Sequence, residues 1–128
     1  GGNGPIASFF AEWMGERRDA CVKLHEWWKA PRTWDKVMAI DPAASHASWM
    51  ENFLWTRLAG VALPAESKAA LDRERFALEN PAGRRRLLGD GNFHGLYQRP
   101  DAEMLALWEV AVAETRAVIG DGWRTTVT

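Results

Sequence analysis

Hydrophobic residues near the start of the chain recur every three or four places, the spacing of one face of an α-helix. Ser8 is a residue type that caps helix N-termini, and Pro31 disfavours helical geometry in the residue before it. We therefore expect a helix from Ser8 to Lys29. Its apolar positions are Phe10, Trp13, Met14, Ala20, Cys21, Leu24, Trp27 and Trp28.

The pattern predicts two more helical segments before position 60. Thr33 is expected to cap a short helical turn. Asp41 followed by Pro42 combines a capping carboxylate with a proline at the first helical position. Gly60 is suited to the left-handed conformation that ends many helices. We therefore expect a helix over residues 42–60, with its apolar stripe at Trp49, Met50, Phe53, Leu54 and Leu58.

The second half of the chain has the same organisation. A helix is expected to open at Pro64 and to end at Asn80, and Pro81 allows a short helix to restart over residues 84–88. Residues 89–92 have turn chemistry, and residues 93–100 indicate an irregular connector. Asp101 is expected to cap the last helix, which stops at the glycines 120 and 122. Its apolar side holds Met104, Leu105, Trp108, Ala111, Val112, Thr115, Val118 and Ile119.

These patterns predict an all-α protein, a single compact irregular helical bundle of four main helices plus two short ones. No stretch of alternating residues competes with the helical spacing, and glycines and prolines fall between the apolar stripes. We expect one helical domain over residues 8–123. Residues 1–7 are expected to be disordered or cloning-derived, and residues 124–128 a short tail.

Composition narrows the class of protein further. Hydrophobic residues make up 47% of the chain and charged residues 26%, which excludes a disordered polymer. The net charge of −1 provides no driving force for nucleic acid, so nucleic acid is not an expected partner. No apolar run has the length of a membrane span, which excludes an integral membrane protein. The lone Cys21 is typical of a reducing compartment, so the cytoplasm is the expected location.

One pair of residues is spaced for metal binding. Cys21 and His25 are four positions apart, so both would reach one ion from a helix face, and thiolate with imidazole suits zinc. A site needs more ligands, and no CxxC or HxxxH pair supplies them. Cys21 also lies in the apolar stripe, where a free thiol behaves as a small hydrophobe. We therefore expect no metal and no cofactor, and no catalytic residue is assigned.

A basic cluster lies in the middle of the sequence. Arg84, Arg85 and Arg86 are consecutive, with Arg73, Arg75 and Arg99 elsewhere in the same region. A solvated helix face is the ordinary interpretation of such a run. If the cluster is functional, its guanidinium groups favour an acidic surface on a protein partner.

Tryptophan gives the strongest indication of function, because eight occur in 128 residues and six of these lie before position 56. Trp27 and Trp28 are adjacent, so on a helix they point about 100° apart and cannot share the centre of one narrow face. Exposed tryptophan is enriched at protein interfaces. The alternative is that further helices of the same domain cover the extra rings.

The leading hypothesis is a non-catalytic interaction module that binds a protein partner or a second copy of itself. The predicted binding residues are Trp27, Trp28, Trp34 and Trp55, with Arg84, Arg85 and Arg86 as an electrostatic rim. The alternative is a small-molecule or metal-dependent domain with an aromatic-lined pocket, whose polar groups would be Cys21, His25 and His46. Peripheral attachment to a lipid or polymer surface through the first helix is a third option.

Overall fold

The computed structural model describes residues 4–16 and 23–122, and the all-α class predicted from the sequence is confirmed. Within these ranges the only β-type pairing is a single antiparallel bridge between Lys68 and Gly95. The α-helices are α1 (Gly4–Gly15), α2 (Pro31–Ile40), α3 (Arg73–Leu78), α4 (Pro81–Leu88) and α5 (Asp101–Gly122), and the short 3₁₀ turns are η1 (Trp27–Lys29), η2 (Trp49–Glu51) and η3 (Leu54–Thr56).

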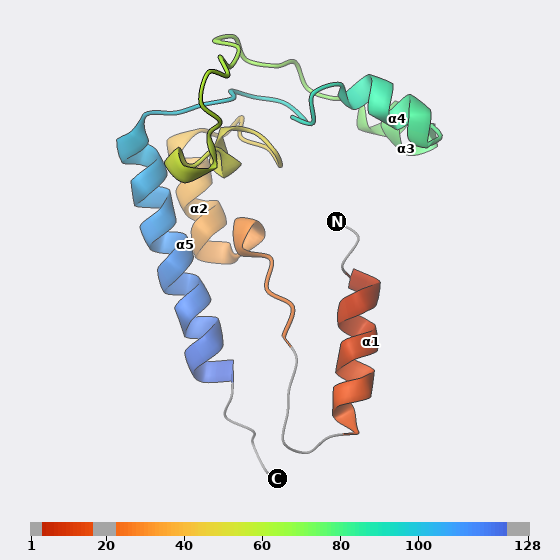
Figure 1. The fold of residues 1–128 in the computed structure, drawn as a ribbon, viewed down its shortest axis with the longest axis vertical. Coiled ribbons are helices and arrows are strands. Elements are labelled where there is room, and N and C mark those ends of the chain that lie inside the picture. The colour runs from red at the N-terminus through yellow and green to blue at the C-terminus, as the bar shows by residue number, and fades with distance from the viewer. Residues whose placement is uncertain (1–3, 17–22, 123–128) are drawn as a thin grey trace.

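Helices α2 and α5 pack side by side and form the centre of the protein (Figure 1). Met104, Leu107 and Ala111 on α5 follow the three-and-four spacing, and all three are buried. The loop with η2 and η3 covers the end of the helix pair. The core so enclosed consists of Val37, Ala44, Trp49, Met50, Phe53, Met104 and Leu107.

A buried carboxylate joins the two central helices. Helix α2 begins after Ala30, whose side chain cannot cap, and has Pro31 at its first position. Glu114 of α5 takes the place of the cap. Its Oε1 accepts the backbone N–H of Arg32 at 3.0 Å, and its Oε2 accepts the N–H and the hydroxyl of Thr33, both at 2.8 Å. Donors left open at a helix start are thus satisfied from another helix.

The expected helix over residues 42–60 is wrong. This segment forms turns with the short η2 and η3. Asp41 begins no helix: its backbone N–H donates to Val37 at the end of α2, and its Oδ2 accepts the indole N–H of Trp49 at 3.0 Å. Ser45 donates its hydroxyl to the carbonyl of His94, 49 residues away, and Ser48 donates to the carbonyl of Ser45. Side-chain hydrogen bonds of this kind compete with the helical ladder, and here they connect the loop to the 92–96 segment.

The expected continuous helix from Ser8 to Lys29 is also wrong. Helix α1 begins at Gly4, within the stretch expected to be disordered, and ends at Gly15. Ser8 lies inside it and donates its hydroxyl back to the Gly4 carbonyl. Residues 23–26 are not helical, and residues 17–22 lie outside the described structure. Gly15 is the physical reason for the early end, since glycine disfavours a helix interior by about 1 kcal/mol relative to alanine.

Two further boundaries differ from the prediction. The helix expected to open at Pro64 is α3, which forms only at Asp72, whose side chain accepts the Arg75 N–H at 2.9 Å. Thr33 lies within the first turn of α2, which begins at Pro31. The short helix expected near residues 84–88 is confirmed as α4, capped by Asn80 and opened by Pro81. The α3–α4 pair extends to one side of the central helices (Figure 1).

Gly95 fixes the close approach between the 41–57 loop and the connector that precedes α5. Its φ is +90°, and a Cβ at this position would lie 2.6 Å from the carbonyl oxygen of Ala43. The neighbouring residue Leu96 accepts the Trp49 N–H at 2.8 Å. A residue without a side chain is therefore needed at this point to seat Trp49 in the core.

A candidate interaction groove with an aromatic edge

An open groove of about 810 Å³ lies along the C-terminal half of α5. We call it the α5 groove. One wall is formed by Leu24 and His25 of the non-helical segment and by Trp27 of η1, and the other is α5 itself. The α5 residues that face it, Trp108, Val112, Thr115 and Ile119, form a line at helical spacing beside the buried line of Met104, Leu107 and Ala111.

Phe53 and Trp108 line one end of this groove, and Trp55 packs against both; we call these three rings the aromatic edge. Phe53 and Trp55 are parallel, with ring centroids 5.2 Å apart, and Trp55 meets Trp108 edge to face at 4.7 Å. Phe53 is buried, whereas Trp55 is 54% exposed and Trp108 is 42% exposed. Two large rings are thus held in place by aromatic contacts while much of their surface faces solvent.

The polar groups of the α5 groove are mostly engaged with one another. His25 Nε2 lies 3.0 Å from the Thr115 hydroxyl, which itself donates to the carbonyl of Ala111 at 2.7 Å. Because the Thr115 hydroxyl donates its single hydrogen to the Ala111 carbonyl, His25 Nε2 must be the donor in the hydrogen bond between His25 and Thr115. Glu51 also lines the groove, and its Oε1 accepts from His46 Nδ1 and from the Ala47 N–H. The remaining charged groups at the groove are Lys23 and Arg116, both exposed.

The predicted tryptophan residues are distributed between the core and the surface. Trp27 lines the α5 groove, with its ring centroid 5.7 Å from that of Phe53. Trp28 lies against the ring of His46 at 5.0 Å. Trp27, Trp28 and Trp34 are all half-buried and pack against the core. Trp55 is the member of the predicted set that is mainly exposed.

The sequence pattern placed Trp108 and Phe53 on the apolar faces of expected helices, and neither was predicted to be part of a binding surface. The sequence did contain a signal for Trp108, because the apolar positions of α5 cover more of its circumference than one packed face requires. Leu105 and Trp108 lie on this second line and are 44% and 42% exposed. No comparable signal marks Phe53, whose position depends on the fold of the 41–57 loop.

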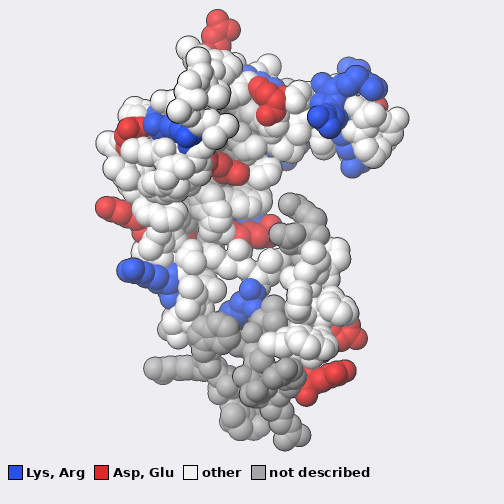
Figure 2. All heavy atoms as spheres, viewed as in Figure 1, with Lys and Arg blue, Asp and Glu red and all other residues white. Residues whose placement is uncertain are grey.

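The structure does not bring the arginine run next to the tryptophan residues. Arg84, Arg85 and Arg86 lie on α4, in the basic cluster at the end of the α3–α4 pair (Figure 2). The C-terminal half of α5 lies at the opposite end of the protein (Figure 1). Arg84 donates to the carbonyls of Phe76 and Ala77 and so satisfies the end of α3. These arginines therefore do not form a rim around the α5 groove.

The metal-binding alternative gains no support from the described residues. Cys21 lies outside them, and His25 pairs with Thr115. Across residues 4–16 and 23–122, no group of three or more His, Cys, Asp or Glu side chains is placed to hold an ion. His46 faces Trp28 and Glu51 rather than His25.

A second charged cluster joins Lys68 to the segment before α5, through Asp90 and Tyr97. Asp90 accepts from the Lys68 ammonium and from the Tyr97 hydroxyl. The hydrogen bond from Lys68, followed by that from Tyr97, lowers the pKa of Asp90 below its usual value. The same contact with Asp90 raises the pKa of Tyr97. Asp90 is paired with both Lys68 and Tyr97, which is the arrangement of a structural tie.

Comparison with known proteins gives no relative on which to base an assignment: no protein-family model, no curated protein and no solved structure matches the chain. None of the helices within the described residues is long and apolar enough to cross a membrane. The arguments about function therefore rest on the groove and on the aromatic edge.

Trp28 is half-buried and Trp55 is mainly exposed, so replacing each by alanine is expected to lower the stability of the protein by different amounts. Trp28→Ala is expected to lower the free energy of unfolding by about 2 kcal/mol or more, because the ring packs against the core. Trp55→Ala is expected to cost only about 1 kcal/mol, the value of its aromatic contacts. Urea denaturation followed by far-UV circular dichroism measures both. Equal losses would contradict the placement of Trp28 against the core.

Proposed function

We propose that this chain is a non-catalytic helical interaction module that binds an apolar helix of a protein partner in the α5 groove. The aromatic edge supplies the anchor residues, and the groove beside it accepts the apolar side chains of the bound helix. The lone cysteine of the chain supports the cytoplasm as the proposed location.

The observation that carries the proposal is the exposure of Trp55 and Trp108 at the end of an apolar groove. Tryptophan is among the residues that contribute most to binding at protein interfaces. Here two such rings are preorganised by an edge-to-face contact at 4.7 Å, so little side-chain entropy remains to be lost on binding. Isolated exposed hydrophobic residues are common, but a contiguous set beside a groove is typical of a binding surface.

The line of apolar residues on α5 supports a helix as the bound element. Trp108, Val112, Thr115 and Ile119 repeat with helical spacing and offer a straight row of contacts. An amphipathic helix that lies in a groove uses the same spacing for its anchor residues. The groove is less suited to a polar small molecule, because His25, Thr115 and Glu51 already form hydrogen bonds within the chain.

Dye binding tests whether the groove is an accessible apolar site. The native protein, diluted until it is monomeric, is expected to raise the fluorescence of bis-ANS. The variant Trp108→Ser is expected to lose most of this signal. Leu78→Ser is the matched control, because Leu78 is an exposed leucine on α3, away from the groove. A signal equal in both variants, or no signal in the native state, would contradict the proposal.

A further inference from the structure

Helix α1 presents an apolar face to solvent. None of its residues is buried, and Phe9 and Phe10 are 63% and 44% exposed. At about 100° per residue, its large apolar side chains fall within one half of the helix circumference. The members of this face are Ile6, Phe9, Phe10 and Trp13.

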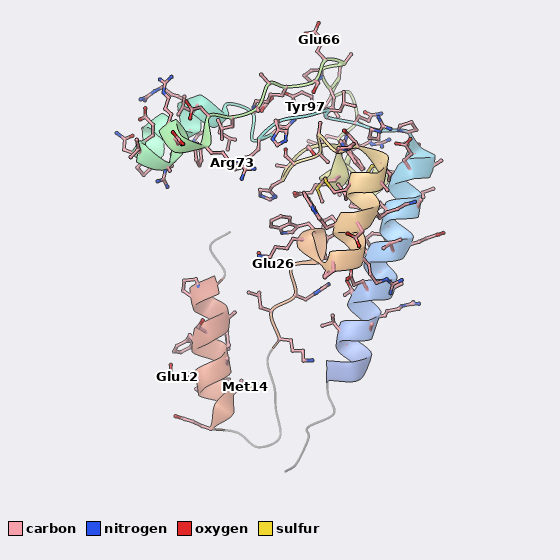
Figure 3. The ribbon with its side chains drawn as sticks, turned by 180° about the vertical axis from the view of Figure 1, so that it is seen from behind. Glu12, Met14, Glu26, Glu66, Arg73 and Tyr97 are labelled. Carbon is pink, nitrogen blue, oxygen red and sulfur yellow. The ribbon has the colours of Figure 1, made fainter. Side chains whose placement is uncertain are left out.

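The charged side chains of helix α1 and of Glu16, the residue that follows it, are all negative. Glu12 and Glu16 are both exposed, and residues 4–16 contain no lysine or arginine. Glu12 lies on the side of α1 that faces away from the central helices (Figure 3). The α5 groove has the opposite character at its edge, where Lys23 and Arg116 are exposed and Glu51 is already hydrogen-bonded within the chain.

The dimensions of the helix and the groove also agree. Helix α1 has 12 residues, which gives a length of about 18 Å. The groove follows α5 from Trp108 to Ile119, a distance of about 17 Å at the helical rise. An apolar helix with acidic residues and a matching apolar groove with basic residues therefore occur in the same chain.

The arrangement of the chain favours contact between two copies. Helix α1 lies on the opposite side of the segment with η1 from α5 (Figures 1 and 3). Residues Lys23 to Trp27 form the wall between them. To enter its own groove, α1 would have to cross over this wall, whereas the helix of another copy enters from the open side.

We propose that the partner bound in the α5 groove is helix α1 of a second copy of this chain. The inference rests on the proposed function, because it names the helix that the groove accepts. Each copy offers one helix and one groove, so a reciprocal exchange satisfies both and closes the assembly as a symmetric dimer. Phe9 and Phe10 make apolar contacts with the aromatic edge. Glu12 and Glu16 make ionic contacts with Lys23 and Arg116.

A charge exchange between full-length variants tests this dimer. The basic-helix variant carries Glu12→Lys and Glu16→Lys, and the acidic-groove variant carries Lys23→Glu and Arg116→Glu. Size-exclusion chromatography with light scattering is expected to give wild-type protein twice the 14.4 kDa mass of one chain. Each variant alone is expected to associate at least about tenfold more weakly, because like charges then meet at the interface.

Mixing the two variants provides the decisive measurement. Opposite charges meet again in both contacts, so a one-to-one mixed dimer is expected. Glu66→Lys with Glu74→Lys is the control for net charge, since both residues are exposed and lie outside α1 and the groove. This control is expected to dimerise like the wild type. Circular dichroism and urea midpoints verify that every variant is folded.

Three results would overturn the inference. They are a wild-type protein that stays monomeric, folded charge variants that still dimerise alone, and a mixture that does not dimerise. A monomeric wild type that binds phosphatidylcholine vesicles through Phe9 and Phe10 would assign α1 to lipid instead.

Dye binding shows whether a result that rejects the dimer also rejects the α5 groove as a binding site. The basic-helix variant leaves its groove empty, so it is expected to bind bis-ANS more strongly than the wild-type dimer. If the wild type is monomeric and its dye signal depends on Trp108, the groove remains a binding site and only the second copy is rejected. If no signal depends on Trp108, both proposals fail.

Discussion

Replacing Trp49 by alanine is expected to remove about 3–5 kcal/mol from the free energy of unfolding, the cost of deleting a large ring from a packed core. Trp49 has no exposed surface and lies among Val37, Phe53 and Leu107. Its indole N–H donates to Asp41 at 3.0 Å, so the substitution also deprives that carboxylate of a partner. Small domains are stable by only about 5–15 kcal/mol, so a large part of the stability would be lost.

Two variants show whether this loss comes from the core. Trp49→Phe keeps most of the buried ring and loses the indole donor, so a cost of about 1–2 kcal/mol is expected. Trp55→Ala removes the same side chain from a position that is 54% exposed, and a much smaller loss is expected. Urea denaturation of all three variants gives the order. If Trp49→Ala and Trp55→Ala lowered the midpoint equally, the core described here would be wrong.

The helices that were predicted well are those whose ends are determined by neighbouring residues. Asn80 with Pro81 marks the start of α4, because the Asn80 side chain accepts the Gly83 N–H three residues later. Asp101 was expected to cap the last helix and is instead the first residue of α5, with its Oδ1 accepting from Arg57 at 2.7 Å, so the start was predicted to within one residue. In both cases the information lies within one helical turn of the boundary.

The segment 42–60 was not predictable because its structure depends on distant residues. Its apolar spacing is compatible with a helix, and Asp41-Pro42 is a strong start signal. Trp49 instead donates its backbone N–H to Leu96, and Ser45 hydrogen-bonds to His94. These partners are more than forty positions away. Local periodicity carries no information about such contacts, so tertiary structure overrode the helical preference.

The candidate site was predictable only in part for the same reason. The excess of tryptophan indicated a binding surface, and Trp27 and Trp55 are found at or beside the α5 groove. The ring of Trp55 packs against that of Trp108, which lies 53 positions further along the chain, and nothing in the sequence predicts this contact. The arginine run was predicted to form a rim beside the tryptophan residues, but it lies on α4, and the α3–α4 pair holds it away from the α5 groove.

The stability of this protein is expected to fall with acidification because of Glu114, which is 9% exposed. Burial tends to raise the pKa of this carboxyl, but the hydrogen bonds from the Arg32 N–H and from the Thr33 hydroxyl and N–H outweigh it. The pKa is therefore lowered from its ordinary value of 4.5. A group whose pKa is lower in the folded state binds its proton more readily when the chain unfolds. Its contribution is complete above about pH 4.5 and is lost as the pH falls through the lower, folded-state value.

Glu114→Gln isolates this contribution. At neutral pH the variant is expected to be less stable by about 2–3 kcal/mol, because hydrogen bonds to a charged acceptor are lost at the start of α2. The difference from the wild type should stay constant down to about pH 5 and then shrink, since protonated Glu114 resembles glutamine. Glu109→Gln on the exposed side of α5 is the matched control and should lack this pH dependence. Urea midpoints measured from pH 7 to pH 3 provide the comparison. A gap between wild type and Glu114→Gln that persists unchanged at the lowest pH would show that the carboxylate charge does not hold α2 to α5.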